Sequence, residues 1–110
     1  MQQFNAARYL GKRIRLSANL KSDGVKEWGG LWMRVDDGRD SLAFDNMHKG
    51  PKDRSIKGTT DWQTYSVVLD VPERATDIYI GFLLSGSGTL WANAIKFEIV
   101  GSDVLVTGRP

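Results

Sequence analysis

The segment GGLWMRVD, residues 29–36, alternates apolar side chains with an aromatic, a basic and an acidic one. Trp32, Arg34 and Asp36 therefore share one face of an extended strand, and the apolar residues between them share the other. A pyranose ring stacks its C–H face on an indole, and its hydroxyl groups then need hydrogen-bond partners beside that ring. Ligand sites typically combine such an aromatic floor with a few polar groups. This mixture is what a sugar site needs, so the pattern makes the side of the strand that carries Trp32 a candidate ligand-binding surface.

Other alternating segments place polar or aromatic residues opposite their own apolar rows. If these strands lie in one sheet, their outer residues join Trp32 on one surface. Trp28 is expected in an exposed loop, where it would grip the edge of a ligand. The alternative is that the polar segment 48–60 covers this face and that no ligand binds there. The predicted ligand-binding residues are Arg15, Trp28, Trp32, Arg34, Asn46 and Tyr79, with Asn19 beside them.

The segment GSGTLWANAIKF, residues 86–97, places Trp91 and Asn93 in a run of alternating apolar residues. On a regular strand both side chains share the face of the later apolar residues, so we expect them to point into the core. A β-bulge near Ala92 or Ala94 would instead turn them outward. The expected inward row of this strand is Trp91, Asn93, Ile95, Phe97 and Ile99.

Residue types that perform catalysis or bind metals are sparse. His48 is the single histidine and there is no cysteine, which excludes disulfides, thiol catalysis and zinc–thiolate sites. Glycoside hydrolysis needs two carboxylates about 5–10 Å apart, and Asp36 and Asp45 are the candidate pair because they lie on adjacent strands of a predicted hairpin. No nucleophile motif or phosphate-binding loop accompanies them. We predict a protein that binds a ligand without transforming it and without a metal or other cofactor.

Short alternating segments separated by turn residues predict an all-β fold. Ser22-Asp23-Gly24 and Asp37-Gly38 have the composition of turns. Six or seven strands with turns every ~8–12 residues indicate an antiparallel sandwich or barrel. The predicted strands are 12–21, 29–36, 41–47, 61–71, 78–84 and 89–100, with 103–107 as a candidate seventh and 48–60 as a loop.

The chain has 110 residues, which predicts one domain over 1–110 with a tail at 102–110. Its net charge is +2 and its basic residues are dispersed among acidic ones, so we expect no nucleic-acid partner. No apolar run approaches the ~20 residues of a membrane span, and we expect no membrane partner. The first residues lack the apolar core of a signal peptide, which favours a cytoplasmic location.

Three stretches, residues 11–23, 29–37 and 58–100, resemble the galactose-binding-like jelly roll of many bacterial carbohydrate-binding modules. The most specific part is TDWQTY at 60–65, followed by an apolar strand, Val-Pro-Glu and a glycine-rich hairpin. The resemblance implies an antiparallel β-sandwich of jelly-roll type with carbohydrate as the ligand class. It also implies that Trp62 packs at the end of the sandwich. Domains of this kind are also appended to bacterial regulators.

The chain departs from the family pattern in two places. Members usually have an earlier strand with an acidic residue that helps hold calcium, whereas this chain begins almost at Lys12. They also carry an acidic pair where this chain has Ala92-Asn93, and calcium needs several hard oxygen ligands; we therefore predict no metal. A missing first strand would leave a sheet edge exposed. Either residues 102–107 cover that edge, or a second copy does so in a homodimer.

The primary prediction is thus a non-catalytic module that binds a carbohydrate or another small molecule on an aromatic-floored sheet face. The alternative is an accessory or sensor domain, or a protein-interaction domain, of a larger bacterial intracellular protein such as a transcriptional regulator. A DNA-binding domain on the same chain would discriminate between the two predictions.

Overall fold

A computed structural model describes residues 2–48 and 53–108. The described part of the chain is built from six β-strands and one short 3₁₀ helix, and all its strand pairs are antiparallel. This confirms the all-β prediction. In chain order the elements are β1 Gln2–Asn5, η1 Ala7–Tyr9, β2 Arg13–Asp36, β3 Ser41–Asp45, β4 Ile56–Asp70, β5 Asp77–Ser85 and β6 Thr89–Val100.

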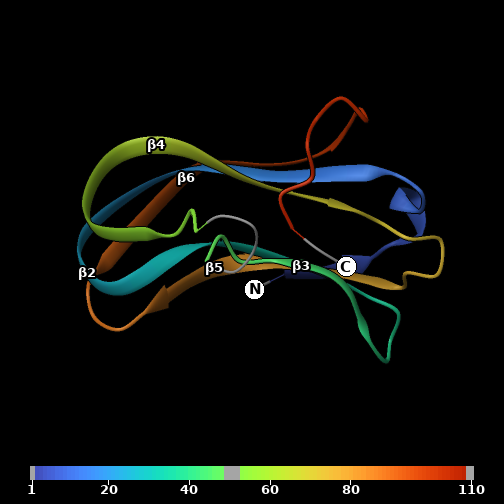
Figure 1. Cartoon of the computed structure of the whole chain (residues 1–110), viewed down its shortest axis with the longest axis horizontal. Helices are drawn as coiled ribbons and strands as arrows, with labels where there is room; N and C mark the ends of the chain where they lie inside the picture. The colour runs from blue at the N-terminus through green and yellow to red at the C-terminus, as the bar shows by residue number, and fades with distance from the viewer. Residues whose placement is uncertain (1, 49–52, 109–110) are drawn as a thin grey trace.

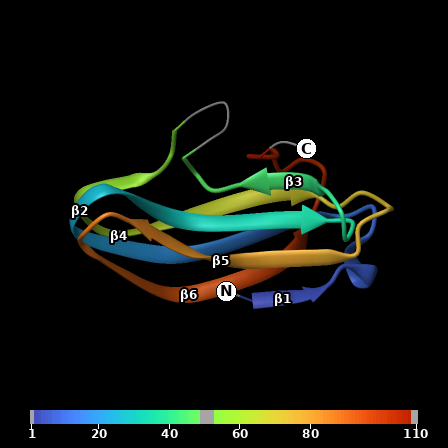
Figure 2. The ribbon, with the colours of Figure 1, turned by 90° about the horizontal axis from the view of Figure 1, so that it is seen from below.

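Strand β2 is 24 residues long and belongs to both layers of the fold. Its first half lies between β4 and β6, and its second half lies between β3 and β5, with β1 beyond β5. Figures 1 and 2 show the two layers, with β2 curving from one to the other at the end of the molecule. Jelly-roll topology, which the family resemblance implied, is a finer description than this arrangement establishes.

The bend in β2 falls at Ser22-Asp23-Gly24. The prediction that these residues reverse the chain in a turn between two strands is wrong, because β2 runs through them. The pairing with β4 changes register at Ser22, Val25 and Gly29 instead, so the strand bends and continues. Ser22 is fully buried, and its Oγ lies 2.8 Å from Thr60 Oγ1. A buried hydroxyl needs such a partner, and this one ties the bend to β4.

The hydrophobic core lies between the two halves of β2. The alternating residues of its first half, from Ile14 to Leu20, are buried, as are Leu31, Met33 and Val35 of its second half. The sequence alternation predicted both rows correctly. Burial of each such side chain contributes ~1.5–3 kcal/mol, so the core strongly favours the bent path of β2.

The N-terminal residues supply the strand that the family comparison had suggested was missing. β1 pairs with β5 from Gln2–Ile80 to Asn5–Asp77. Phe4 of β1 packs edge-on against Phe97 of β6, with ring centroids 4.8 Å apart. Aromatic contacts of this geometry are favourable, and this one joins the two layers at one end of the β1–β6 side.

The tail does not form the predicted edge strand: residues 102–108 contain no strand, and 109–110 lie outside the described residues. Thr107 nevertheless covers the free edge of β4, because its N–H donates to Val68 O at 2.9 Å and its Oγ1 accepts from Val68 N at 2.7 Å. The predicted loop 48–60 is also shorter, since β4 already begins at Ile56; residues 49–52 of it lie outside the described part.

A buried carboxylate joins the tail to the segment before β4. Asp45 is fully buried and pairs with the Arg54 guanidinium. Its Oδ2 also accepts from Thr107 Oγ1 at 2.5 Å, and its Oδ1 accepts from Met47 N at 2.8 Å. Arg54 Nη1 donates to Ser66 O of β4 at 2.9 Å. A buried charge requires this degree of pairing and hydrogen bonding.

Replacing Arg54 with methionine should lower the free energy of unfolding by about 3–5 kcal/mol, because it leaves the Asp45 carboxylate buried without its cation. The matched control is Arg15→Met, which breaks the half-exposed Arg15–Glu98 pair and should change stability by no more than ~1 kcal/mol. Urea denaturation measures both. Equal losses in the two variants would contradict the structural role of the Asp45 pair.

Candidate functional site

Trp32, Arg34 and Tyr79 lie together on the outer surface of one layer, as predicted. Arg34 pairs in register with Tyr79 of β5 and with Phe44 of β3, and Trp32 pairs with Gly81. We call Trp32, Arg34, Phe44 and Tyr79 the Trp32 face. The indole lies over Gly81, where an added Cβ would come within 2.7 Å of its Nε1, so glycine is what allows Trp32 to lie flat on the sheet.

The polar groups of the Trp32 face are already engaged with one another. The guanidinium carbon of Arg34 is 4.6 Å from the centroid of the Tyr79 ring, a cation–π distance. Arg34 Nε is also 3.0 Å from Asp36 Oδ1, an ion-pair distance, but the two atoms are buried and neither has a hydrogen-bond partner among the described residues. These contacts hold the guanidinium in one orientation, which would reduce the entropy lost when a ligand binds.

Arg15 and Asn19 do not join this face, so that part of the predicted surface is wrong. Both lie on the first half of β2, which belongs to the other layer, and their side chains face the opposite side of the sandwich. Arg15 is paired with Glu98 of β6 at 2.6 Å. Parity along a strand does not reveal that the strand changes layers, which is why the sequence grouped them with Trp32.

Trp28 and Asn46 lie near the Trp32 face but are engaged locally. Trp28 is on β2 and half-buried rather than in an exposed loop, and its ring stacks on His48 with centroids 4.5 Å apart. Asn46 Oδ1 accepts a hydrogen bond from His48 N at 3.0 Å, an arrangement typical of turns. Both residues therefore position the segment after β3.

His48 is close to a hydroxyl and a carboxylate, but not in the arrangement that nucleophilic catalysis uses. Ser55 Oγ and Asp53 Oδ1 lie 3.5 Å and 3.7 Å from the same ring nitrogen, Nδ1, whereas a catalytic triad uses both nitrogens. Hydrogen bonds from the Ser55 hydroxyl and N–H, and from Lys57, lower the pKa of Asp53 below its ordinary value. This carboxylate remains ionised at neutral pH and stabilises the local turn by accepting hydrogen bonds from Ser55.

The carboxylate pair considered for glycoside cleavage is not assembled. Asp45 opposes the inward-facing Met33 and is fully buried, while Asp36 binds Arg34 on the outer surface. Within residues 2–48 and 53–108, no three His, Asp or Glu side chains gather closely enough to hold a metal ion. The same residues include no helix that is long and apolar enough to span a membrane.

Trp91 and Asn93 face outward, so the core prediction for them is wrong and the β-bulge alternative holds. The pairing of β6 with β2 shifts between Lys96 and Asn93, and Ala94 has a φ of 51°. Beyond this shift the two side chains lie beside the outward-facing Asn19 and Lys21. Trp91 is 43% exposed, and Lys21 Nζ lies 5.7 Å from its ring centroid.

Trp62 lies beside the bend of β2, where β4 shifts register opposite Lys21, and its side chain is 43% exposed, so the end of the sandwich covers it only in part. Ile95 and Ile99 were expected in the core but are 54% and 50% exposed. Both isoleucines keep the inward parity of their strand, but the space between the two layers is open beside Ile95.

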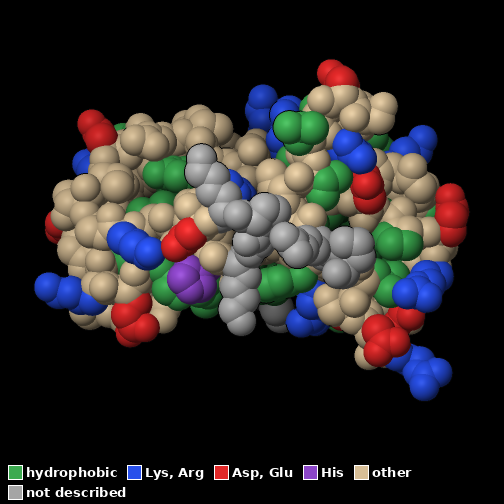
Figure 3. All heavy atoms as spheres, in the orientation of Figure 1, with side chains coloured by type: hydrophobic (Ala, Val, Ile, Leu, Met, Phe, Trp, Pro, Cys, Tyr) green, Lys and Arg blue, Asp and Glu red, His purple; other side chains and the backbone are tan. Residues whose placement is uncertain are grey.

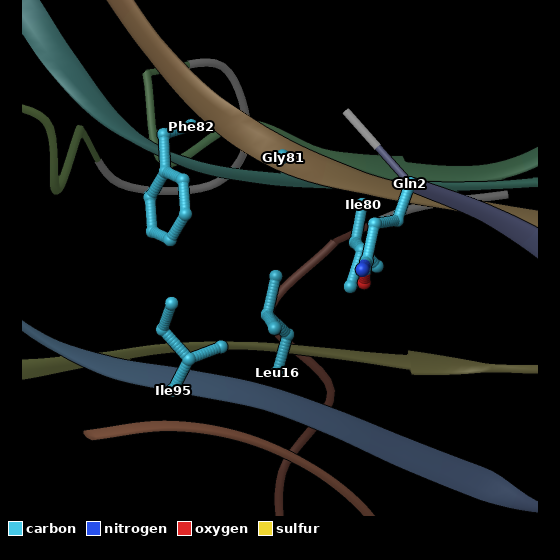
Figure 4. Close-up of a pocket in the computed structure, with 6 residues that line it drawn as sticks. All are labelled: Gln2, Leu16, Ile80, Gly81, Phe82 and Ile95. Atoms are coloured by element: carbon cyan, nitrogen blue, oxygen red, sulfur yellow. The ribbon is translucent and has the colours of Figure 1, made fainter. Parts of the chain in front are cut away.

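That opening is a cleft of about 350 Å³ between the two layers. Figure 4 shows Ile80 and Phe82 of β5 on one wall, facing Leu16 of β2 and Ile95 of β6 on the other. Gln2 of β1 lies at one end and Gly81 completes the lining. Nothing in the sequence distinguishes this site, because every one of its apolar residues has the parity of an ordinary core residue.

Charge is dispersed on the face of the molecule drawn in Figure 3. On the described part of that face, basic and acidic side chains are interspersed. Charges also pair directly elsewhere in the described residues, as in Lys57–Asp53 and Arg13–Asp70, with N–O distances of 3.0 Å and 2.7 Å. Pairing of this kind provides no concentrated positive surface for nucleic-acid phosphates on that face.

No family model matches the chain. Over 105 residues, 94% of its length, the chain is 50% identical to the uncharacterized HTH-type transcriptional regulator YbfP of Bacillus subtilis (strain 168). The chain spans about a third of that regulator's length, 34%.

The bulge that turns Trp91 outward yields a direct test by glycine substitution. Ala94→Gly should raise the free energy of unfolding by roughly 0.5–1 kcal/mol, because alanine is strained at positive φ and glycine is not. Ala92→Gly, two residues away on the same strand, should lower it by roughly 0.5–1 kcal/mol. Urea denaturation of both variants measures the signs. A loss of stability in both would mean that β6 is regular at Ala94.

Proposed function

We propose that this chain is a non-catalytic sensor domain of a transcriptional regulator and that it works in the cytoplasm. The observation that carries the proposal is the 50% identity over 94% of the chain to part of YbfP, which is named as an HTH-type regulator. This supports the alternative prediction from the sequence over the primary one, carbohydrate binding.

The fold is consistent with a role beside a DNA-binding unit. A helix-turn-helix reads DNA with an α-helix in the major groove, and the described residues of this chain form strands and one three-residue 3₁₀ helix. We therefore assign to this chain the effector-binding role, and to another part of such a regulator the contact with DNA. Its open interlayer cleft is a feature that an effector site requires.

An antibody raised against the 110-residue chain tests this assignment in the source cells. It should detect a protein of about three times the mass of this chain, since the chain covers 34% of the relative. Chromatin immunoprecipitation with the same antibody should enrich discrete DNA sites. Detection of a free 12.3 kDa protein that enriches no DNA would contradict the proposal, and pre-immune serum is the control.

Carbohydrate binding remains a second candidate function because the Trp32 face keeps the required geometry. Its indole lies flat on the sheet beside an oriented guanidinium and a tyrosine. A sugar would stack on Trp32, and Arg34 would donate to its hydroxyl groups. In this reading the sugar is the effector of the same regulator, so the two candidates share an overall role and differ in the surface used.

On a glycan array, Trp32→Ala should abolish any binding shown by the unmodified chain, because the stacking platform is removed while the buried core is untouched. The matched control is Trp91→Ala, which deletes an exposed indole on the opposite layer and should leave sugar binding unchanged. Far-ultraviolet circular dichroism checks that both variants fold. Binding that survives Trp32→Ala, or that is lost with Trp91→Ala, would exclude the Trp32 face.

A further inference from the structure

The interlayer cleft has a closed floor and an open rim. Leu16 and Ile80 at its floor are 2% and 8% exposed, while Phe82 and Ile95 at its rim are 43% and 54% exposed. Figure 4 shows these side chains projecting toward one another from the two layers across the gap. The exposed residues are therefore not scattered surface apolar groups but the mouth of a concave site.

The lining determines the chemistry of what fits. Four of the six lining residues are aliphatic or aromatic, one is glycine and one is Gln2. None of the six carries a charge, and Lys96 and Glu98 of the adjacent strand lie on the outer surface beside Ser17 and Arg15. A charged ligand would lose its hydration there without gaining a partner. One carboxamide supplies a single hydrogen-bonding position at the end of the cleft.

The size indicates a small molecule. The cleft of about 350 Å³ lies at the lower end of the ~300–1,000 Å³ range of ligand pockets. It is roughly twice the ~150 Å³ apolar cavity that holds benzene. A molecule of about two fused rings, or an acyl chain of similar volume, matches that space.

The adjacent strand edge disfavours a second copy or a peptide strand as the occupant. Strand addition needs a regular edge, and bulges and charged residues block it. The β6 edge has a bulge at Ala94, with a φ of 51°, followed by the charged Lys96 and Glu98. β1, on the other side of the cleft, is only four residues long. A small molecule can fill the cleft without using either edge.

We propose that this cleft is the effector site of the domain and that it binds an uncharged, chiefly apolar small molecule of about two-ring size. That the ligand is an effector rests on the proposed regulator function. That the cleft binds a molecule of this kind rests on its lining and its size. The cleft is also separate from the Trp32 face, which lies on the outer surface of the β3–β2–β5 layer.

The test is fluorescence titration of the 110-residue chain with 1-naphthylamine, a fluorescent two-ring amine that is uncharged at neutral pH. The probe should bind saturably with one site per chain. Ile95→Asp should weaken binding at least tenfold by placing a charge at the mouth. The matched control is Ile99→Asp on the same strand, since Ile99 is similarly exposed but does not line the cleft; it should change affinity less than twofold.

A second pair of variants and a charged probe complete the design. Phe82→Asp should also weaken binding at least tenfold, and Leu84→Asp, two residues along β5, should not. The anionic analogue 1-naphthylamine-5-sulfonate should bind at least tenfold more weakly than the neutral probe.

Equal effects of lining and control variants, equal affinity for the two probes, or absence of saturable binding would each overturn the proposal. So would a dimer in sedimentation that Ile95→Asp dissociates, because the cleft would then be an interface. None of these results bears on the immunoprecipitation experiment, so the regulator assignment and the cleft assignment fail independently.

Discussion

Every feature of this fold depends on one constraint, namely that a single strand serves both layers. β2 contributes Ile14 to Leu20 to one side of the core and Leu31 to Val35 to the other. Its neighbours β4, β5 and β6 each take their register from it. The bend is therefore the point at which the two sheets are held together covalently, and Ser22, buried against Thr60, holds it by hydrogen bonds.

The same constraint explains where the molecule is closed and where it is open. On the β3–β4 side, Asp45, Arg54 and Thr107 join the layers through a buried ion pair and hydrogen bonds. On the β1–β6 side no such link follows the Phe4–Phe97 contact within the described residues. The described pairing of β1 with β5 ends at Ile80, so Phe82 lies beyond it and faces the opening.

The strands and the core were predictable from sequence because alternation is local information. All six long predicted segments lie within or nearly coincide with strands, and the paired apolar rows of β2 are buried as expected. What the sequence concealed depends on long-range geometry. A bend and a turn at Ser22-Asp23-Gly24 have the same composition, and nothing local shows that Arg15 and Trp32 end on opposite surfaces. The sequence is compatible both with a regular strand and with a one-residue bulge near Ala92 or Ala94, and parity alone does not select between them.

The candidate site was predicted only in part for a further physical reason. The sequence identifies residues that are able to bind, such as Trp32, Arg34 and Tyr79, and these do assemble. It does not identify apolar residues that fail to be covered. Ile95 and Phe82 have the same pattern as buried residues, and only the spacing of the layers exposes them.

The two surfaces differ in what they leave unsatisfied. On the Trp32 face Arg34 contacts the Tyr79 ring and lies at ion-pair distance from the Asp36 carboxylate, although Arg34 Nε and Asp36 Oδ1 are buried without a hydrogen-bond partner among the described residues. The cleft leaves apolar area in contact with water, and burying such area contributes a free energy of ~25 cal/mol per Å². Folded domains seldom keep concave apolar surfaces of this kind without a function. Filling the cleft would recover that free energy and would also bridge β5 to β6, on the side where the Phe4–Phe97 contact joins the layers at one end. A ligand that bridges the layers would stabilise the sandwich, because it binds the folded state and not the unfolded chain.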